Sequence, residues 1–358
     1  MKGCINHKRV WFGLISVGLL LAVSNTGYTQ ECTDCHGAHG GLFLYQGTDC
    51  SACHSAHHHD FSGSFVIPSF HNADGLICNK CHTMHASEDG ELPTMPGDAG
   101  PMLGPNPHLL YKSEVTDLCL VCHAGELNST GAPIVLAPDE ASMGTTHPLL
   151  PGGDFFYTQG AAEKSNGHDP GGTIIGVDNT FTNSPGGTFL SANETCISCH
   201  DPHGGSPAND YRLLKLKPGD WTGADLIVVG VEGHPGTDEE GNPPGYGSGF
   251  AVWCGACHGD FHNPTTGGSW LKHPTDTALG FGGNITVPAN YGATYQWTHP
   301  VEWPGGTFDN LTAEVFCLSC HRAHATAYSN STRWDNTEPS GVDGDGDGAG
   351  CNKCHEKG

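Results

Sequence analysis

Basic residues are scarce in this chain. Only 14 of its 358 residues are Lys or Arg, against 38 Asp and Glu, so the formal net charge is −24 at pH 7. A chain this acidic is not expected to bind nucleic acid, and its field favours cationic partners or metal ions. Solubility outside the cell explains the same charge equally well.

The chain also lacks the material for a large apolar core. Hydrophobic residues make up 36% of it, whereas it has 53 glycines and 24 prolines. The one long apolar run, Val10 to Val23, follows a positively charged start, which is typical of a signal peptide rather than a membrane span. We expect residues 1–24 to be removed, with cleavage between 24 and 30, and no transmembrane segment in the mature chain.

A pentapeptide, Cys-x-x-Cys-His, recurs along the sequence. Two cysteines three residues apart can both bond to the vinyl groups of one haem, and the histidine that follows can ligate the iron. The eight copies are Cys32-Cys35-His36, Cys50-Cys53-His54, Cys78-Cys81-His82, Cys119-Cys122-His123, Cys196-Cys199-His200, Cys254-Cys257-His258, Cys317-Cys320-His321 and Cys351-Cys354-His355. Zinc sites built from such cysteine pairs do not require a histidine after each pair. We therefore expect eight covalent haem c groups, with these eight histidines as proximal iron ligands.

The unequal spacing of the motifs indicates an array with variable loops. We expect a mostly irregular, loop-rich multihaem cytochrome c fold with short helices at the haem motifs, little β-strand and a core of stacked haems. Residues 25–130 would form a crowded four-haem N-terminal region, and residues 131–358 a four-haem C-terminal region with long Gly/Pro-rich loops. Residues 151–187 and 233–249 are expected to be loops, and residues 227–231 a short strand.

Histidine is abundant, with 24 copies, so every iron could have a second, distal histidine. A histidine three residues after a proximal one is tethered on the proximal side of its own haem and can reach only a neighbouring haem. A histidine followed by proline sits in a restricted loop. The distal candidates are His39, His57, His71, His85, His147, His203, His299 and His324, with His108, His234, His262 and His273 in a second rank. His168, followed by Asp169 and Pro170, is a weaker addition, and a surface histidine is the alternative for each.

The sequence resembles two groups of known proteins. The dipeptide His147-Pro148 and the later run from Cys196 to Gly204 are similar to multihaem cytochromes of the doubled Cys-x-x-Cys-His type. The run from Phe70 to His85 resembles the start of filament-forming extracellular cytochromes of metal-reducing microbes. That resemblance implies self-association into a conductive homopolymer, in which His71 reaches a haem of the adjacent subunit. This chain departs from the pattern by placing two haem motifs and the triplet His57-His58-His59 before that run.

These features predict an exported electron-transfer protein, extracellular or at the cell surface, or alternatively periplasmic. Its partners would be redox proteins or extracellular acceptors such as metal oxides and other cytochromes. The alternatives are a monomeric multihaem carrier and an octahaem oxidoreductase acting on a small nitrogen or sulfur compound. Such an enzyme needs an iron with an open position. Eight motifs that all end in histidine, and a surplus of distal candidates, argue against enzymatic activity.

A further acidic pattern precedes the last motif. Asp343, Asp345 and Asp347, followed by a glycine, match the opening of a calcium loop, but Cys354 stands where that loop carries glutamate. The alternatives are a Ca²⁺ site at these three aspartates and a flexible acidic turn.

Overall fold

The structure of the chain is a computed structural model. It describes residues 81–82, 106–125, 132–139, 152–160, 165–203, 211–230, 246–262, 275–278, 300–304 and 312–335. All of these belong to one of two compact units into which the chain divides, the unit made of residues 67–86 and 93–358. The fourth to seventh attachment motifs are described in full, and the third contributes Cys81 and His82.

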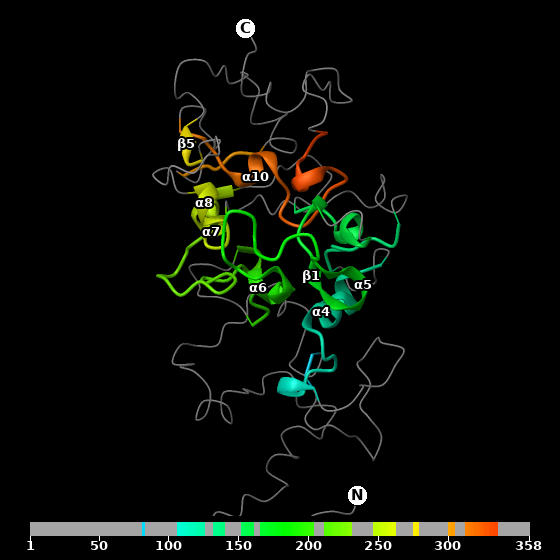
Figure 1. The fold of residues 1–358 in the computed structure, drawn as a ribbon. Coiled ribbons are helices and arrows are strands. Elements are labelled where there is room, and N and C mark those ends of the chain that lie inside the picture. The colour runs from blue at the N-terminus through cyan, green and yellow to red at the C-terminus, as the bar shows by residue number, and fades with distance from the viewer. Residues whose placement is uncertain are drawn as a thin grey trace, which may run out of the picture. The chain divides into compact units, whose positions relative to one another are not determined.

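The helices are short, and most of them carry an attachment motif (Figure 1). Helix α4 (Val115–His123) ends on the fourth motif, and α7 (Phe250–Gly255) runs into the sixth, whereas α6 (Cys196–Cys199) and α10 (Cys317–Cys320) are each a single Cys-x-x-Cys turn. Two further helices are α5 (Gly172–Ile175) and α8 (Gly259–His262). The 3-10 turns are η2 (Pro107–Leu109), η4 (Phe155–Thr158), η6 (Ser191–Asn193), η7 (Tyr211–Leu213) and η8 (Ser329–Ser331). The expectation of short helices at the motifs is confirmed.

Serine residues inside two motifs cap their own helical turns. The hydroxyl of Ser198 accepts a hydrogen bond from the backbone N–H of Thr195, and that of Ser319 accepts one from Phe316, at 3.0 and 3.1 Å. Each bond satisfies a donor at the start of a helix only four residues long. In these two motifs the serine before the second cysteine therefore stabilises the helical turn that holds both cysteines.

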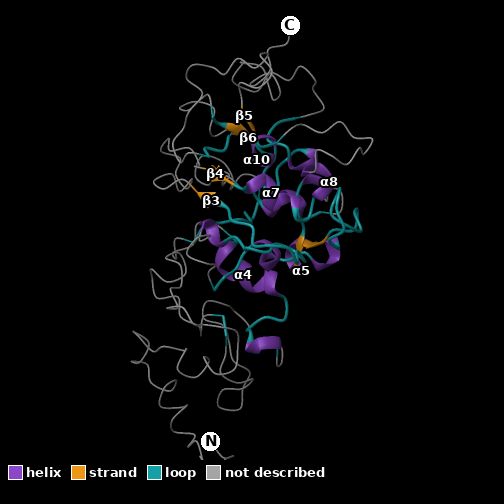
Figure 2. Cartoon of the chain, turned by 90° about the vertical axis from the view of Figure 1, so that its left-hand side faces the viewer, coloured by secondary structure: helices purple, strands orange, loops and turns teal. Residues whose placement is uncertain are grey.

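Strands are few among the described residues, and loops connect most elements (Figure 2). The antiparallel pairs are β1 (Pro170–Gly171) with β2 (Gly176–Val177), β3 (Val229–Gly230) with β4 (Tyr246–Ser248) and β5 (Thr277–Ala278) with β6 (Glu314–Val315). The strand expected within residues 227–231 is present as β3.

The expectation that residues 151–187 and 233–249 form only loops is wrong. Elements η4, β1, α5 and β2 lie in the first segment, and β4 lies in the second. Gly171, Gly172 and Gly176 have φ angles of 75°, 79° and 81°, a region that only glycine adopts at little cost. The glycines that suggested a loop thus allow a tight reversal of the chain around α5.

Two small apolar clusters support the motif helices. In the first, the rings of Tyr246, Phe250 and Phe316 lie 5.0–5.6 Å apart, between α7 and the start of α10. In the second, Leu120 of α4 packs with Phe155 and other buried side chains. Clusters of this size are small beside the apolar area that a haem offers, in keeping with a core completed by porphyrin.

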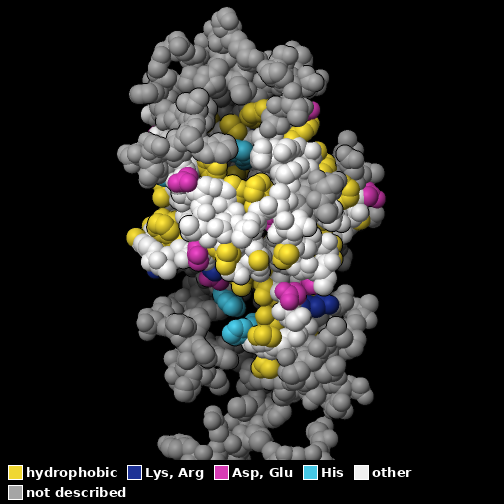
Figure 3. All heavy atoms as spheres, viewed as in Figure 1, with side chains coloured by type: hydrophobic (Ala, Val, Ile, Leu, Met, Phe, Trp, Pro, Cys, Tyr) yellow, Lys and Arg dark blue, Asp and Glu magenta, His cyan; other side chains and the backbone are white. Residues whose placement is uncertain are grey.

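Helix α4, from the expected N-terminal region, packs against α5 and α6 of the expected C-terminal region. These contacts join the two predicted regions. The division of the chain at residue 130 stays a prediction from the sequence. Within the described part of the chain, no helix is both long and apolar enough to cross a membrane. On the face shown in Figure 3, Lys and Arg side chains are few, as the composition requires.

Candidate functional site

Every proximal histidine that the structure describes is bonded through its ring Nδ1 to a backbone carbonyl. The carbonyls belong to His108 for His82, Pro133 for His123, Arg212 for His200, Pro185 for His258 and Asn330 for His321, at 2.7–2.9 Å. Since a carbonyl only accepts, Nδ1 carries the proton and Nε2 keeps its lone pair. This is the tautomer in which an imidazole ligates iron.

The third, fifth and seventh motifs share one local structure. The residues that supply the carbonyl, His108, Arg212 and Asn330, have φ angles of 56°, 50° and 59°. The residue two positions later forms an antiparallel bridge with the proximal histidine in each case. Positive φ is uncommon outside glycine, so the residue types at these positions do not predict the turns.

Three proximal histidines face a second histidine ring. The ring centroids of His82 and His203 lie 6.1 Å apart, those of His200 and His324 6.3 Å, and those of His258 and His168 5.9 Å. A ligating imidazole nitrogen lies about 2 Å from its metal, so two rings on one metal have centroids roughly 6 Å apart. Each spacing fits one iron between the rings. Together with the adjacent cysteines and the Nδ1 bonds, these pairs fit haem c.

Burial favours the neutral imidazole of His258, His321 and His324. It lowers the pKa of His258 to about 4 and that of His324 to about 3, and it lowers the pKa of His321 as well. The His324 ring is also stacked on Phe155, with centroids 4.5 Å apart. Neutral imidazole is the form that binds metal, so no proton has to leave before ligation.

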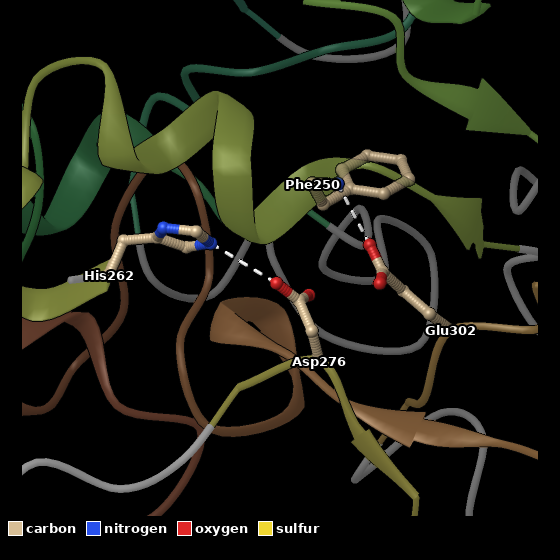
Figure 4. Close-up of polar contacts among 4 residues, drawn as sticks. All are labelled: Phe250, His262, Asp276 and Glu302. Carbon is tan, nitrogen blue, oxygen red and sulfur yellow. Dashed lines mark hydrogen bonds and ion pairs between the residues drawn. The ribbon is translucent and has the colours of Figure 1, made fainter. Parts of the chain in front are cut away.

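The structure separates the distal candidates that it describes. His203 and His324 face proximal rings, whereas Nε2 of His262 lies 3.1 Å from a carboxylate oxygen of Asp276 (Figure 4). His108 contributes its carbonyl to His82. The predicted residues outside the described part are His39, His57, His71, His85, His147, His234, His273, His299, Asp343, Asp345 and Asp347, together with the first, second and eighth motifs.

His168, a weaker candidate from the sequence, has its ring opposite that of His258. Its backbone N–H donates to the carbonyl of His324 at 2.8 Å, and its Nδ1 lies 2.5 Å from the carbonyl of Ala323. It therefore has the same Nδ1 bond as the proximal histidines. The available signal was a proline two residues later, at Pro170, rather than directly after the histidine.

Thiols of consecutive motifs lie next to one another. Hydrogen bonds join Cys119 to Cys196 and Cys254 to Cys317; in each pair the bond raises the pKa of the first thiol and lowers that of the second. Charge interactions also link Cys81 to Cys119 and Cys199 to Cys257. The helices of the fourth and fifth motifs, α4 and α6, also pack against each other, as do those of the sixth and seventh, α7 and α10.

No family model matches the chain. It is 27% identical to the C-type cytochrome OmcS of Geobacter sulfurreducens over 356 residues, which cover 75% of this chain and 80% of OmcS. It is similar in structure to the outer membrane cytochrome S filament from the same organism, with a TM-score of 0.51 and 24% identity over 73% of this chain and 84% of that chain. For the OmcS nanowires determined by cryo-EM, the TM-score is 0.54 at 24% identity, over 77% and 88%. These likenesses confirm the expected loop-rich multihaem fold.

Proposed function

Because this chain is a homologue of the multihaem c-type cytochrome OmcS, we propose that it is an exported electron-transfer protein with eight covalent haems. Its irons are mostly bis-histidine and low-spin, and the chain polymerises into an extracellular conductive filament. The observation that carries the proposal is the pairing of histidine rings that come from different attachment motifs.

The proposal includes three distal ligands, and the ring pairs support each of them. His203 serves the haem on Cys78 and Cys81, and His324 serves the haem on Cys196 and Cys199. In both cases the ligand lies three residues after one proximal histidine and reaches the haem two motifs earlier. Continued toward the N-terminus, the same step assigns His85 to the haem on Cys32 and Cys35.

His168 is the distal ligand of the haem on Cys254 and Cys257. Its ring lies 5.9 Å from that of His258, and backbone and ring hydrogen bonds attach it to the 323–324 segment of the seventh motif. Each of these distal ligands therefore links segments that are distant in the sequence. Iron ligation by these histidines would therefore join distant segments and stabilise a loop-rich chain whose apolar clusters are small.

The haem on Cys317 and Cys320 supports the filament. Its proximal ligand His321 has the usual Nδ1 bond, to Asn330, and among the described residues no histidine ring faces it; the same is true of His123 in the fourth motif. A histidine from a second copy of this chain completes that haem and joins the subunits head to tail. His71 is the candidate that the sequence resemblance suggests, and two structurally similar proteins are a filament and a nanowire.

The chain fixes the route of electrons by fixing the order of its anchors. Bound haem supplies a one-electron couple that changes little in ligation when both axial sites are imidazole. The closeness of cysteines from consecutive motifs, from Cys81 to Cys317, supports one series of the third to seventh haems. Redox proteins and extracellular acceptors such as metal oxides are the partners at its ends.

Two measurements on the haem-loaded protein test this proposal. Electron paramagnetic resonance should show low-spin haem alone, apart from an open seventh haem in dissociated subunits, and electron microscopy should show filaments. A high-spin signal that persists in filaments and shifts on adding nitrite or sulfite would favour the octahaem enzyme. Monodisperse particles at high protein concentration would favour the monomeric carrier.

A further inference from the structure

Glu302 is a carboxylic acid in the interior of the described region. Only 1% of its surface is exposed. Its backbone is paired on one side with Glu314 of β6, through two hydrogen bonds of 2.9 and 3.0 Å, and bridges Tyr246 of β4 on the other. A side chain held between two extended segments in this way has little freedom to turn toward solvent.

The side chain of Glu302 makes one hydrogen bond and otherwise meets like charge. Its Oε1 accepts a bond of 2.8 Å from the backbone N–H of Phe250, the first residue of α7 (Figure 4). Carboxylate oxygens of Asp276 and Glu314 lie with it in a group whose members are within 4.8 Å of one another. In the part of the chain that the structure describes, no Lys or Arg forms an ion pair with these three carboxylates.

Among the residues that the structure describes, few titratable groups surround Glu302. Asp276 precedes β5, Glu314 lies in β6, and Tyr246 lies in β4, while α7 and α10 contribute only the thiols of Cys254 and Cys317. His262 of α8 reaches the group only through Asp276. Burial raises the pKa of Glu302 to about 8; the Phe250 N–H opposes the shift, and the charges of Asp276 and Glu314 add to it.

Glu302 lies near the anchors of two haems. Its Oε1 is bonded to the first residue of α7, the helix that carries Cys254, and its backbone partner Glu314 lies three residues before Cys317 at the start of α10. An added negative charge at either iron therefore acts on Glu302 through a buried, weakly screened environment. Reduction of a haem at Cys254 or Cys317 should therefore favour the protonated, neutral form of Glu302.

We propose that Glu302 takes up a proton when a haem anchored at Cys254 or Cys317 is reduced. Bound haem would accept one electron from the redox partner, and the Glu302 carboxylate gains one proton from hydronium or buffer acid in the solvent, forming an O–H bond. This role rests on the proposed electron-transfer function. It makes electron transfer at these two haems pH-dependent, which the axial histidines alone do not require.

Potentiometric titration of the haem-loaded full chain at several pH values, with dithionite as reductant and a chelator present, tests this. The wild-type midpoint potential of up to two haems should fall as pH rises through the region near 8. Glu302→Gln stays neutral, so its potentials should not fall there and should exceed the wild-type values at high pH. Asp225→Asn, at an exposed ion pair with Lys217, should behave like wild type.

A second variant retains Glu302 and lowers the pKa of its carboxyl group. Asp276→Asn removes a charge that raises the Glu302 pKa, so the fall in potential should occur at lower pH. An identical pH dependence in wild type, Glu302→Gln and Asp276→Asn would overturn the proposal. Covalent haem content and the low-spin spectrum, measured on the same samples, report separately on the proposed electron-transfer function.

Discussion

His203 lies against His82 with ring centroids 6.1 Å apart and ring planes inclined by 19°, although the two residues belong to different attachment motifs. His203 follows His200 by three residues, and we expect that it cannot turn back to the haem proposed for His200. The pair therefore indicates that one haem segment supplies a ligand to another.

Replacing His203 by alanine should remove one axial ligand and leave covalent haem attachment intact. About one haem of the full complement should change from low-spin to high-spin, because only the distal site of the haem on Cys78 and Cys81 is opened. Electron paramagnetic resonance of the purified variant measures this change. Retention of every low-spin signal would show that another group ligates this iron.

A matched pair of variants separates His168 from His262. His168→Ala should convert the haem on Cys254 and Cys257 to high-spin, because its ring faces His258. His262→Ala should keep all haems low-spin, because His262 is bonded to Asp276. If instead His262→Ala produced the high-spin haem and His168→Ala did not, His262, which is nearer in sequence to the sixth motif, would be the distal ligand.

The fold class could be predicted from the sequence because its cause is local: five-residue motifs set short helices, and a glycine- and proline-rich chain makes loops between them. The distal ligands could be predicted only in part. Spacing by three residues points to His203 and His324, since it follows from tethering. The position of His168 depends on hydrogen bonds to residues 323 and 324, which no local pattern encodes.

Gly187 should tolerate no side chain, because a Cβ there would overlap the carbonyl of Cys257 in the sixth motif. Gly187→Ala should lower the unfolding free energy by about 1–3 kcal/mol or reduce haem loading. Gly259→Ala is the control, since a Cβ at Gly259 meets nothing within 4 Å. Thermal unfolding and haem content, measured side by side, check both. Equal behaviour of the two variants would contradict the close packing at Gly187.

Stability should depend on pH through Glu302. Its folded pKa, about 8, lies above its ordinary value of 4.5, so the folded state binds the proton more tightly. The resulting contribution of Glu302 to the free energy of unfolding is complete below pH 4.5. It is lost as pH rises toward 8, and the loss is on the order of a few kcal/mol. Thermal midpoints should fall over this range in wild type and fall less in Glu302→Gln. The same slope in both proteins would show that other groups cause it.

The haem of the seventh motif offers the most direct test of the proposed head-to-tail filament. In an electron cryo-microscopy reconstruction of the native assembly, the haem on Cys317 and Cys320 should have His321 on one side and an imidazole from a second copy of the chain on the other. The haems should then form one continuous row through the filament. Discrete particles, or a ligand to this iron from the same chain, would contradict the head-to-tail filament.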